Sequence, residues 1–341
     1  MKKRLLAMLL AAAMCTGLAA CSSDTGTATT PEGGETAESG DGSYNIDVIL
    51  KTTASEYWQY VQAGAMAYQK DNPNVTVTVK GAPSETSYQE QLNMIQTDLA
   101  GDYDGFVIAP LQADMVANLI EGQTKPIVAV DTKIEAPEVI SFVGTGNESA
   151  GALGGAAAVE AAKAAGWTEI KAIEIAGVQG DTTNTDRMNG YMKGIEEAGG
   201  DFLEDEVQYA DAVATKAVDA MNGIMSRYPD GIAIICANND DMAIAAAKAA
   251  ADSGNEAYAN TIFLGFDGIQ SACDAILEGR LTMSVAQQGY EMGYMAVEAV
   301  VNNLNGEEVE EFIDSGADVV TADNAQKRKE TLQGYLDALE A

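Results

Sequence analysis

The chain has 341 residues, and its 52 Asp and Glu against 19 Lys and Arg give a formal net charge of −33. A chain this acidic is repelled by the phosphates of nucleic acid and by anionic lipid surfaces, so we expect no nucleic-acid partner. It contains no histidine, which removes the commonest metal ligand and general base, and we predict neither a metal site nor a cofactor.

The N-terminal segment has the pattern of an export signal. Three basic residues follow Met1, an apolar run covers residues 5–14, and small residues lead to Cys21. We predict a lipoprotein signal peptide over residues 1–20, because the apolar run is too short to span a bilayer. The Leu-Ala-Ala-Cys sequence ending at Cys21 is typical of a bacterial lipobox, in which the cysteine is acylated; the alternative is an ordinary cleavage site with an incidental cysteine. The predicted location is extracytoplasmic, lipid-anchored to the cell membrane on its outer face or periplasmic side.

The next segment, up to residue 43, consists almost only of Ser, Thr, Gly, Ala, Glu and Asp. Such a composition cannot bury a core, so we predict that residues 21–43 are the acylated cysteine and a flexible linker. The remaining chain of about 300 residues suits two lobes of ordinary domain size.

Short β-branched runs then alternate with longer alanine-rich amphipathic stretches. Strands are predicted over residues 46–50, 75–80, 105–109, 127–130 and 140–143, and in a second series over 170–175, 206–209, 232–236, 262–265 and 282–286. Helices between them are predicted over residues 58–70, 88–100, 150–165, 187–198 and 241–251. This alternation indicates an α/β fold of two doubly wound parallel-sheet lobes, whose ligand site is expected in the cleft between them.

The glycine-rich segment at residues 144–147, followed by Gly151, has the spacing of neither GxGxxG nor the Walker loop. We interpret it as a turn between lobes, with close helix packing at Gly151, Gly154 and Gly155. No nucleophile elbow, paired-carboxylate signature or calcium loop is recognisable, so we do not predict an enzyme. Hydrolysis by carboxylates on separate loops stays an alternative.

Polar residues follow four of the predicted strands, namely Asp131, Asn239, Asp267 and Gln287. Each alone could be a turn residue or a helix cap, and Asp240 is interpreted as a cap. Four in the same topological place favour convergence on a ligand. Carboxylates and amides suit a hydroxyl-rich ligand because they form paired hydrogen bonds with it.

Two adjacent aromatic residues, Tyr57 and Trp58, open the first predicted helix just after Ser55. Sugar rings have apolar faces that aromatic side chains bury, while neighbouring polar groups hold the hydroxyls. The alternative is that either aromatic belongs to the core behind the helix.

From about residue 46 to residue 320 the chain resembles the ribose- and galactose-type periplasmic binding proteins, the type I solute receptors of ABC importers. The most specific pieces are Ala-Asn-Asn-Asp-Asp-Met-Ala at 237–243, similar to the family's A-x-N-D-x-M-A element, and Gly-Phe-Asp-Gly at 265–268, similar to its G-F-D-G element. The strand ending at Asp131, the Ala286-Gln287 pair and the arginine-containing helix start at 185–191 add to the resemblance.

The resemblance implies that Asp131, Asn239, Asp267 and Gln287 contact the ligand. It places Tyr57 and Trp58 at paired aromatic positions that sandwich a sugar, and Ser55 where an asparagine often binds a hydroxyl. It also implies three chain crossings, near residues 145–147, 287–288 and 314–317. The lobes would be residues 44–145 plus 288–314 and residues 146–287 plus 315–325, with a C-terminal helix over 326–341 packed on a lobe.

Four positions depart from the family pattern. Thr132 stands where an arginine follows the aspartate in the pentose binders, and Thr185 stands where a second sugar-binding arginine is expected, which leaves Arg187 as the structural partner. We still count Lys51, Thr132, Thr185 and Arg187 among the predicted ligand-binding residues. Lys51 ends the first strand, where a small polar residue is common, and Ala212 falls near an expected aromatic. Because guanidinium and ammonium groups bind differently, we expect another monosaccharide than ribose, a sugar derivative, or a ligand with one negative charge near Lys51.

The sequence therefore predicts a monomeric substrate-binding lipoprotein that captures a monosaccharide or derivative and delivers it to an ABC permease. The same cleft would serve a sensory receptor that feeds a chemoreceptor or histidine kinase. A sugar-responsive transcription regulator would need an N-terminal helix-turn-helix, where this chain has the predicted signal and linker. An exported enzyme is the third alternative.

Overall fold

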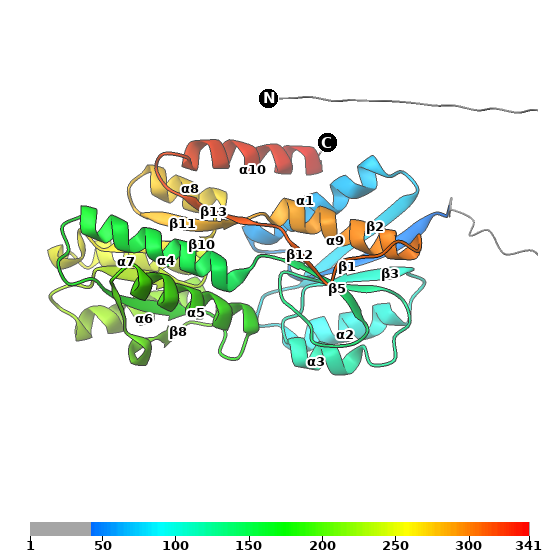
Figure 1. Ribbon diagram of the computed structural model, residues 1–341, viewed down its shortest axis with the longest axis horizontal. Helices are drawn as coiled ribbons and strands as arrows, with labels where there is room; N and C mark the ends of the chain where they lie inside the picture. The colour runs from blue at the N-terminus through cyan, green and yellow to red at the C-terminus, as the bar shows by residue number, and fades with distance from the viewer. Residues whose placement is uncertain (1–41, 341) are drawn as a thin grey trace, which may run out of the picture. The chain divides into compact units, whose positions relative to one another are not determined.

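The computed structural model describes residues 42–340, and its strands form two separate sheets (Figure 1). The predicted signal peptide and Cys21 lie outside the described residues, as does the predicted linker except for its last two residues.

The first sheet has six parallel strands in the order β12, β5, β4, β3, β1, β2. The strands are β1 (Tyr44–Thr52), β2 (Val75–Ala82), β3 (Gly105–Ile108), β4 (Ile127–Val130), β5 (Val139–Gly144) and β12 (Phe312–Asp314). Helices α1 (Glu56–Asp71) and α9 (Gly289–Leu304) cover one face, and α2 (Tyr88–Leu99) and α3 (Ala113–Leu119) cover the other (Figure 1). Strand β4 is apolar and buried along its whole length, as a strand covered on both faces must be. We call this sheet with its helices the first lobe.

The second lobe is built on the sheet β13, β11, β10, β9, β6, β7, with β8 also paired to β6. Its strands are β6 (Lys171–Ala176), β7 (Asp201–Phe202), β8 (Gln208–Tyr209), β9 (Ile234–Ala237), β10 (Ile262–Asp267), β11 (Met283–Gln287) and β13 (Ala317–Val320). Its helices are α4 (Asn147–Ala164) and α5 (Thr182–Glu197) on one face, α6 (Ala214–Arg227), α7 (Asp240–Asp252) and α8 (Gln270–Leu277), and the short η1 (Glu204–Glu206) and η2 (Glu256–Tyr258). Only β13 pairs antiparallel in this sheet. The predicted α/β fold of two doubly wound lobes is confirmed.

The chain passes between the two sheets three times: from β5 to α4, from β11 to α9, and from β12 to β13. The first and third crossings lie side by side, because the backbone N–H of Ser315 donates to the carbonyl of Gly144 over 2.8 Å. These three segments are the covalent connections about which the lobes could move.

The glycines of α4 allow the close helix packing that the sequence predicted. A Cβ added to Gly151 would lie 2.7 Å from the carbonyl oxygen of Arg187, and one added to Gly155 would lie 2.7 Å from that of Tyr191. Gly154 faces the sheet instead, where a Cβ would lie 2.4 Å from Cγ2 of Val285. The packing interpretation is therefore confirmed for all three.

The last helix, α10 (Ala325–Glu340), contacts both lobes (Figure 1). From the sequence, we expected this helix to pack on one lobe only. It packs on α8 of the second lobe and on α1 of the first, and Leu332 is 1% exposed in the contact. The ring of Tyr335 stacks on Tyr290 of α9 with centroids 4.0 Å apart. Arg328 donates to the carbonyl of Gln287 over 2.5 Å, at the second crossing.

None of the helices between residues 42 and 340 combines the length and the apolar character needed to cross a membrane.

We expect Leu332→Ala to lower the free energy of unfolding by about 2–4 kcal/mol, because it removes a buried side chain and leaves a cavity. Leu277→Ala on α8 is the matched control, since Leu277 is 42% exposed, and it should change stability by about 0.5 kcal/mol or less. Urea unfolding followed by circular dichroism measures both. Equal losses in the two variants would show that α10 does not pack tightly on the lobes.

Candidate functional site

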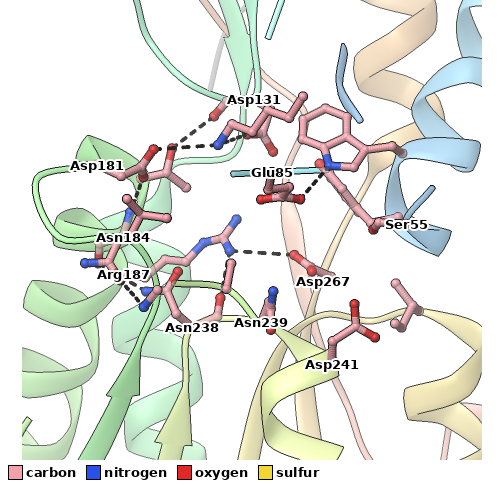
Figure 2. Close-up of a pocket in the computed structure, with 18 residues that line it drawn as sticks. Ser55, Glu85, Asp131, Asp181, Asn184, Arg187, Asn238, Asn239, Asp241 and Asp267 are labelled. Carbon is pink, nitrogen blue, oxygen red and sulfur yellow. Dashed lines mark hydrogen bonds and ion pairs between the residues drawn. The ribbon is translucent and has the colours of Figure 1, made fainter. Parts of the chain in front are cut away.

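A cavity lies between the two lobes, and side chains from both line it (Figure 2). It holds about 610 Å³ of space between atoms, including its opening to solvent. The first lobe contributes the ends of β1 and β4, the start of α1 and the loop after β2. The second lobe contributes the loop after β6, the start of α5 and the ends of β9 and β10. Open parallel sheets bind ligands at these carboxyl ends of strands.

Most of the side chains that the sequence indicated lie at this cavity. The lining includes Lys51, Ser55, Tyr57, Trp58, Asp131, Arg187, Asn239 and Asp267. It does not include Thr132, Thr185 or Gln287.

Lys51 is buried at the end of β1, and its ammonium is already paired. Its Nζ lies 3.4 Å from Oδ2 of Asp131 in the first lobe and 3.7 Å from Oδ2 of Asp181 in the second. Burial by itself would lower the pKa of Lys51, but the carboxylates of Asp181, Asp131 and Glu85 outweigh burial and raise it. The expectation of a negatively charged ligand near Lys51 stays a prediction, and such an anion would have to compete with Asp131 and Asp181 for the ammonium.

Arg187 is more than the structural partner that the sequence implied. Its Nε donates to Oδ1 of Asn147 over 2.9 Å and its Nη1 to the carbonyl of Asn238 over 2.8 Å. The same Nη1 lies 3.6 Å from Oδ1 of Asp267, and the guanidinium stacks 3.9 Å from the ring centroid of Phe266. Arg187 thus both fixes the loop ends of the second lobe and faces the cavity (Figure 2).

Two carboxylates at strand ends have strained backbones. Asp131 follows β4 with φ 65° and Asp267 ends β10 with φ 119°, both in a region that non-glycine residues rarely adopt. Such strain costs on the order of 1–3 kcal/mol and is typical of functional sites. Burial raises the pKa of Asp267 well above its usual range, although Arg187 opposes the shift.

Gln287 lies behind Asp267 and not at the cavity. It is 1% exposed, and its Nε2 donates to Oδ1 of Asp267 over 2.7 Å. Asn239 lines the cavity and is itself the helix cap, since its Oδ1 accepts from the backbone N–H of Met242 over 2.9 Å. The interpretation of Asp240 as the cap is wrong: its carboxylate is buried and accepts from the N–H of Ile269.

The two threonines at expected arginine positions also lie off the cavity. Thr132 is buried and donates to Oδ2 of Asp131 over 2.9 Å, and its oxygen lies 2.9 Å from that of Thr183 across the lobe boundary. Thr185 is exposed, and its hydroxyl donates to the carbonyl of Asp181. Residues two apart on a helix point about 200° apart, so Thr185 cannot share a face with Arg187, whereas Thr183 does and lines the cavity.

The aromatic pair forms a wall of the cavity. Tyr57 and Trp58 are 5% and 2% exposed and meet edge to face with centroids 5.1 Å apart. The indole Nε1 of Trp58 donates to Oε1 of Glu85 over 2.9 Å. Both aromatics also belong to the core of the first lobe, so the core alternative is confirmed, and their contact with a sugar stays a prediction.

Sequence reasoning missed several lining residues, among them Glu85, Asp181, Thr183, Asn184, Asn238 and Asp241. Glu85 lies in the loop after β2, so the strand-end rule applied to that strand would have found it. Asp181 is the N-cap of α5 and accepts from the N–H of Asn184 over 2.8 Å, which an Asp before a helix typically does.

A fully buried carboxyl supports the floor of the site. Oε1 of Glu174 accepts from Nδ2 of Asn238 over 3.1 Å, and Oε2 has no partner among the described residues. Burial raises the pKa of Glu174 from 4.5 to about 8, although Asn238 and Arg187 oppose the shift.

Between these two pKa values, about 4.5 and about 8, the folded protein keeps a proton that the unfolded chain has lost. Stability from this group is complete below the lower value and falls by about 1.4 kcal/mol per pH unit as pH rises. In Glu174→Gln that loss is absent, so we expect its stability relative to the native chain to rise with pH across this window. Urea unfolding at several pH values measures it, with exposed Glu90→Gln as control. If the difference in unfolding free energy between Glu174→Gln and the native chain did not change with pH, Glu174 would not be a buried carboxyl that stays protonated in the folded protein.

Within residues 42–340, no three or more Asp, Glu, Cys or His side chains are grouped so that they could hold a metal ion.

The relatives that the chain resembles are sugar-binding proteins. The chain is 30% identical over 265 residues to the D-allose-binding periplasmic protein of Escherichia coli, covering 75% of this chain and 83% of that one. It is 26% identical to the ribose import binding protein of Salmonella typhimurium, covering 78% and 86%. A carbohydrate transporter solute-binding protein from Agrobacterium radiobacter, solved with D-arabinose, is 26% identical and superimposes with a TM-score of 0.78, covering 86% of this chain and 99% of that one.

The model of the periplasmic binding protein domain family matches residues 46–308, which is most of the chain and both lobes. This match agrees with the two doubly wound sheets and with the cavity at their facing strand ends. The family consists of solute-binding proteins of ABC transporters and is not enzymatic. The chain belongs to the periplasmic binding protein domain family.

Proposed function

We propose that the chain is the substrate-binding lipoprotein of an ABC importer, which captures a monosaccharide or sugar derivative between its lobes and delivers it to the permease. The observation that carries this proposal is the cavity, in which the Tyr57–Trp58 wall meets carboxylates and amides from both lobes. Aromatic side chains cover the apolar face of a sugar ring, and carboxylates and amides hydrogen-bond its hydroxyls.

The ligands of the relatives support a monosaccharide. The Escherichia coli relative is a D-allose-binding protein, the Salmonella relative serves ribose import, and the Agrobacterium protein holds D-arabinose. At identities of 26–30% these names support the class of ligand and not the individual sugar.

The residues proposed to touch the ligand are those that line the cavity: Lys51, Ser55, Tyr57, Trp58, Asp131, Arg187, Asn239 and Asp267, with Glu85 and Asp181 added. Thr132 and Gln287 would not touch the ligand themselves; their hydrogen bonds orient Asp131 and Asp267, which would. Thr185 takes no part, since its exposed hydroxyl bonds to the backbone of its own helix.

The proposed mechanism is closure of the lobes about the three crossings, which excludes water from the ligand. Closure is favoured to the extent that the ligand contacts both lobes at once, because only a difference in affinity between open and closed forms shifts their populations. The importer's separate ATPase would supply the energy of transport. The receptor would act as a monomer on the outer or periplasmic side of the membrane, held by the lipid at Cys21.

A thermal-shift screen against sugars, polyols and nucleosides tests the ligand class. A ligand that binds the native state alone raises the melting temperature, and we expect monosaccharides or their derivatives to do so. A screen in which only nucleosides raise it would exclude the sugar assignment.

For the sugar found in this way, we expect Asp131→Asn to weaken binding at least about tenfold, since a hydrogen bond to a charged group contributes roughly 1.5–3 kcal/mol. Asp114→Asn is the control, because Asp114 is exposed on α3 of the same lobe. Isothermal titration calorimetry measures both variants, with circular dichroism to verify folding. Unchanged affinity in a folded Asp131→Asn protein would remove Asp131 from the site.

The lipid anchor is tested by labelling cells with a palmitate analogue. We expect the protein to be labelled, Cys21→Ala to abolish the label, and Cys15→Ala to retain it, because Cys15 lies in the segment predicted to be removed. Label that persists in Cys21→Ala would contradict the lipoprotein assignment.

A further inference from the structure

The charges of the cavity do not balance. The carboxyl groups of Glu85, Asp131, Asp181, Asp241 and Asp267 line it, against two cations, from Lys51 and Arg187. Burial favours the protonated form of Asp267 by raising its pKa, so the surplus of negative charge rests on the other four carboxylates. The other polar lining side chains are neutral amides and hydroxyls. A closed site of this composition presents surplus negative charge to whatever it holds.

Both cations are already engaged by the protein. Lys51 lies within 3.4 Å of Asp131 and 3.7 Å of Asp181. Arg187 donates from Nε to Asn147 and from Nη1 to the carbonyl of Asn238, and it lies 3.6 Å from Asp267. A ligand anion would have to displace a carboxylate from one of these pairs, which makes an acidic sugar or a free amino acid a poor fit.

Asp241 is exposed to solvent, and among the other four carboxyl groups Glu85 has the fewest protein partners. The only protein donor to it among the described residues is the indole of Trp58, at 2.9 Å. Burial raises the pKa of Glu85, Lys51 and Trp58 lower it in part, and Asp131 and Asp181 raise it further. The ammonium of Lys51 is thus the shared counter-charge of Asp181, Asp131 and Glu85.

We propose that the ligand carries one positive charge, and that this receptor, if the proposed sugar-binding function holds, takes an amino sugar whose ammonium lies against Glu85. The hydroxyls of such a ligand would meet the amides and the remaining carboxylates, and its ring would lie on the aromatic wall. The ammonium would pair with the half-buried Glu85 and complete the charge balance that the protein leaves open around Lys51, because a carboxylate shielded from water is costly unless it is paired.

The test is calorimetric titration with matched ligands at a slightly acidic pH. Amino sugars that carry the ammonium at different ring carbons are each compared with the parent neutral sugar and with the N-acetylated form, which keeps the nitrogen and loses the charge. We expect one amino sugar to bind at least about tenfold more tightly than both of its neutral counterparts. In Glu85→Gln that ratio should fall by about tenfold, and in the control Glu90→Gln, exposed on α2, it should not change.

The other outcomes separate the two proposals. A neutral sugar that binds as tightly as its amino form, or a Glu85→Gln protein that keeps the full ratio, would overturn the amino-sugar inference and leave the sugar receptor intact. If no saccharide of either kind binds to the folded protein, the proposed sugar-binding function itself fails.

Discussion

The ion pair that joins the lobes through Lys51 is the interaction on which the site depends. The lysine and Asp131 belong to the first lobe and Asp181 to the second, so a single buried ammonium draws the two lobes together. Breaking such a pair by removing one partner leaves an uncompensated buried charge, which is costlier than the pair is favourable. Without the lysine, Asp131 and Asp181 would keep their hydrogen bonds from Thr132 and Asn184 but would lose this counter-charge. Contacts between Thr132 and Thr183, and from Gln270 to Glu56 over 2.6 Å, join the lobes on either side of it.

This arrangement also explains why the arginines expected from the family can be absent. A guanidinium beside Asp131 would donate several fixed hydrogen bonds to a ligand, whereas the ammonium of Lys51 is a point charge that the protein's own carboxylates absorb. Arg187, locked by Asn147 and stacked on Phe266, is likewise committed to the protein. Carboxyl groups outnumber cations in the lining of the site, and hydroxyls and ammonium groups are the ligand groups that satisfy acceptors.

Much of the fold and part of the site could be predicted, for identifiable reasons. Central strands such as β4 are continuous apolar runs, and residues that follow them, such as Asp131 and Asp267, lie at the cavity because parallel strands end at one edge. Thr185 does not line the cavity, where the sequence comparison had placed it, because the direction in which a helical side chain points depends on its angular position around the helix. A two-residue strand such as β7 is too short to show any periodicity in the sequence. The place of α10 across both lobes depends on long-range packing that no local pattern encodes.

The most direct test of the site uses the fluorescence of Trp58 alone. The chain has two tryptophans, and Trp167 lies away from the cavity with its Nε1 donating to the carbonyl of Asn260. In a Trp167→Phe protein, a saccharide that raises the melting temperature should produce a saturable change in Trp58 emission, with the dissociation constant found by calorimetry. A saccharide that raises the melting temperature and leaves the emission of Trp58 unchanged would place its binding site elsewhere and contradict the interlobe cavity as the ligand site.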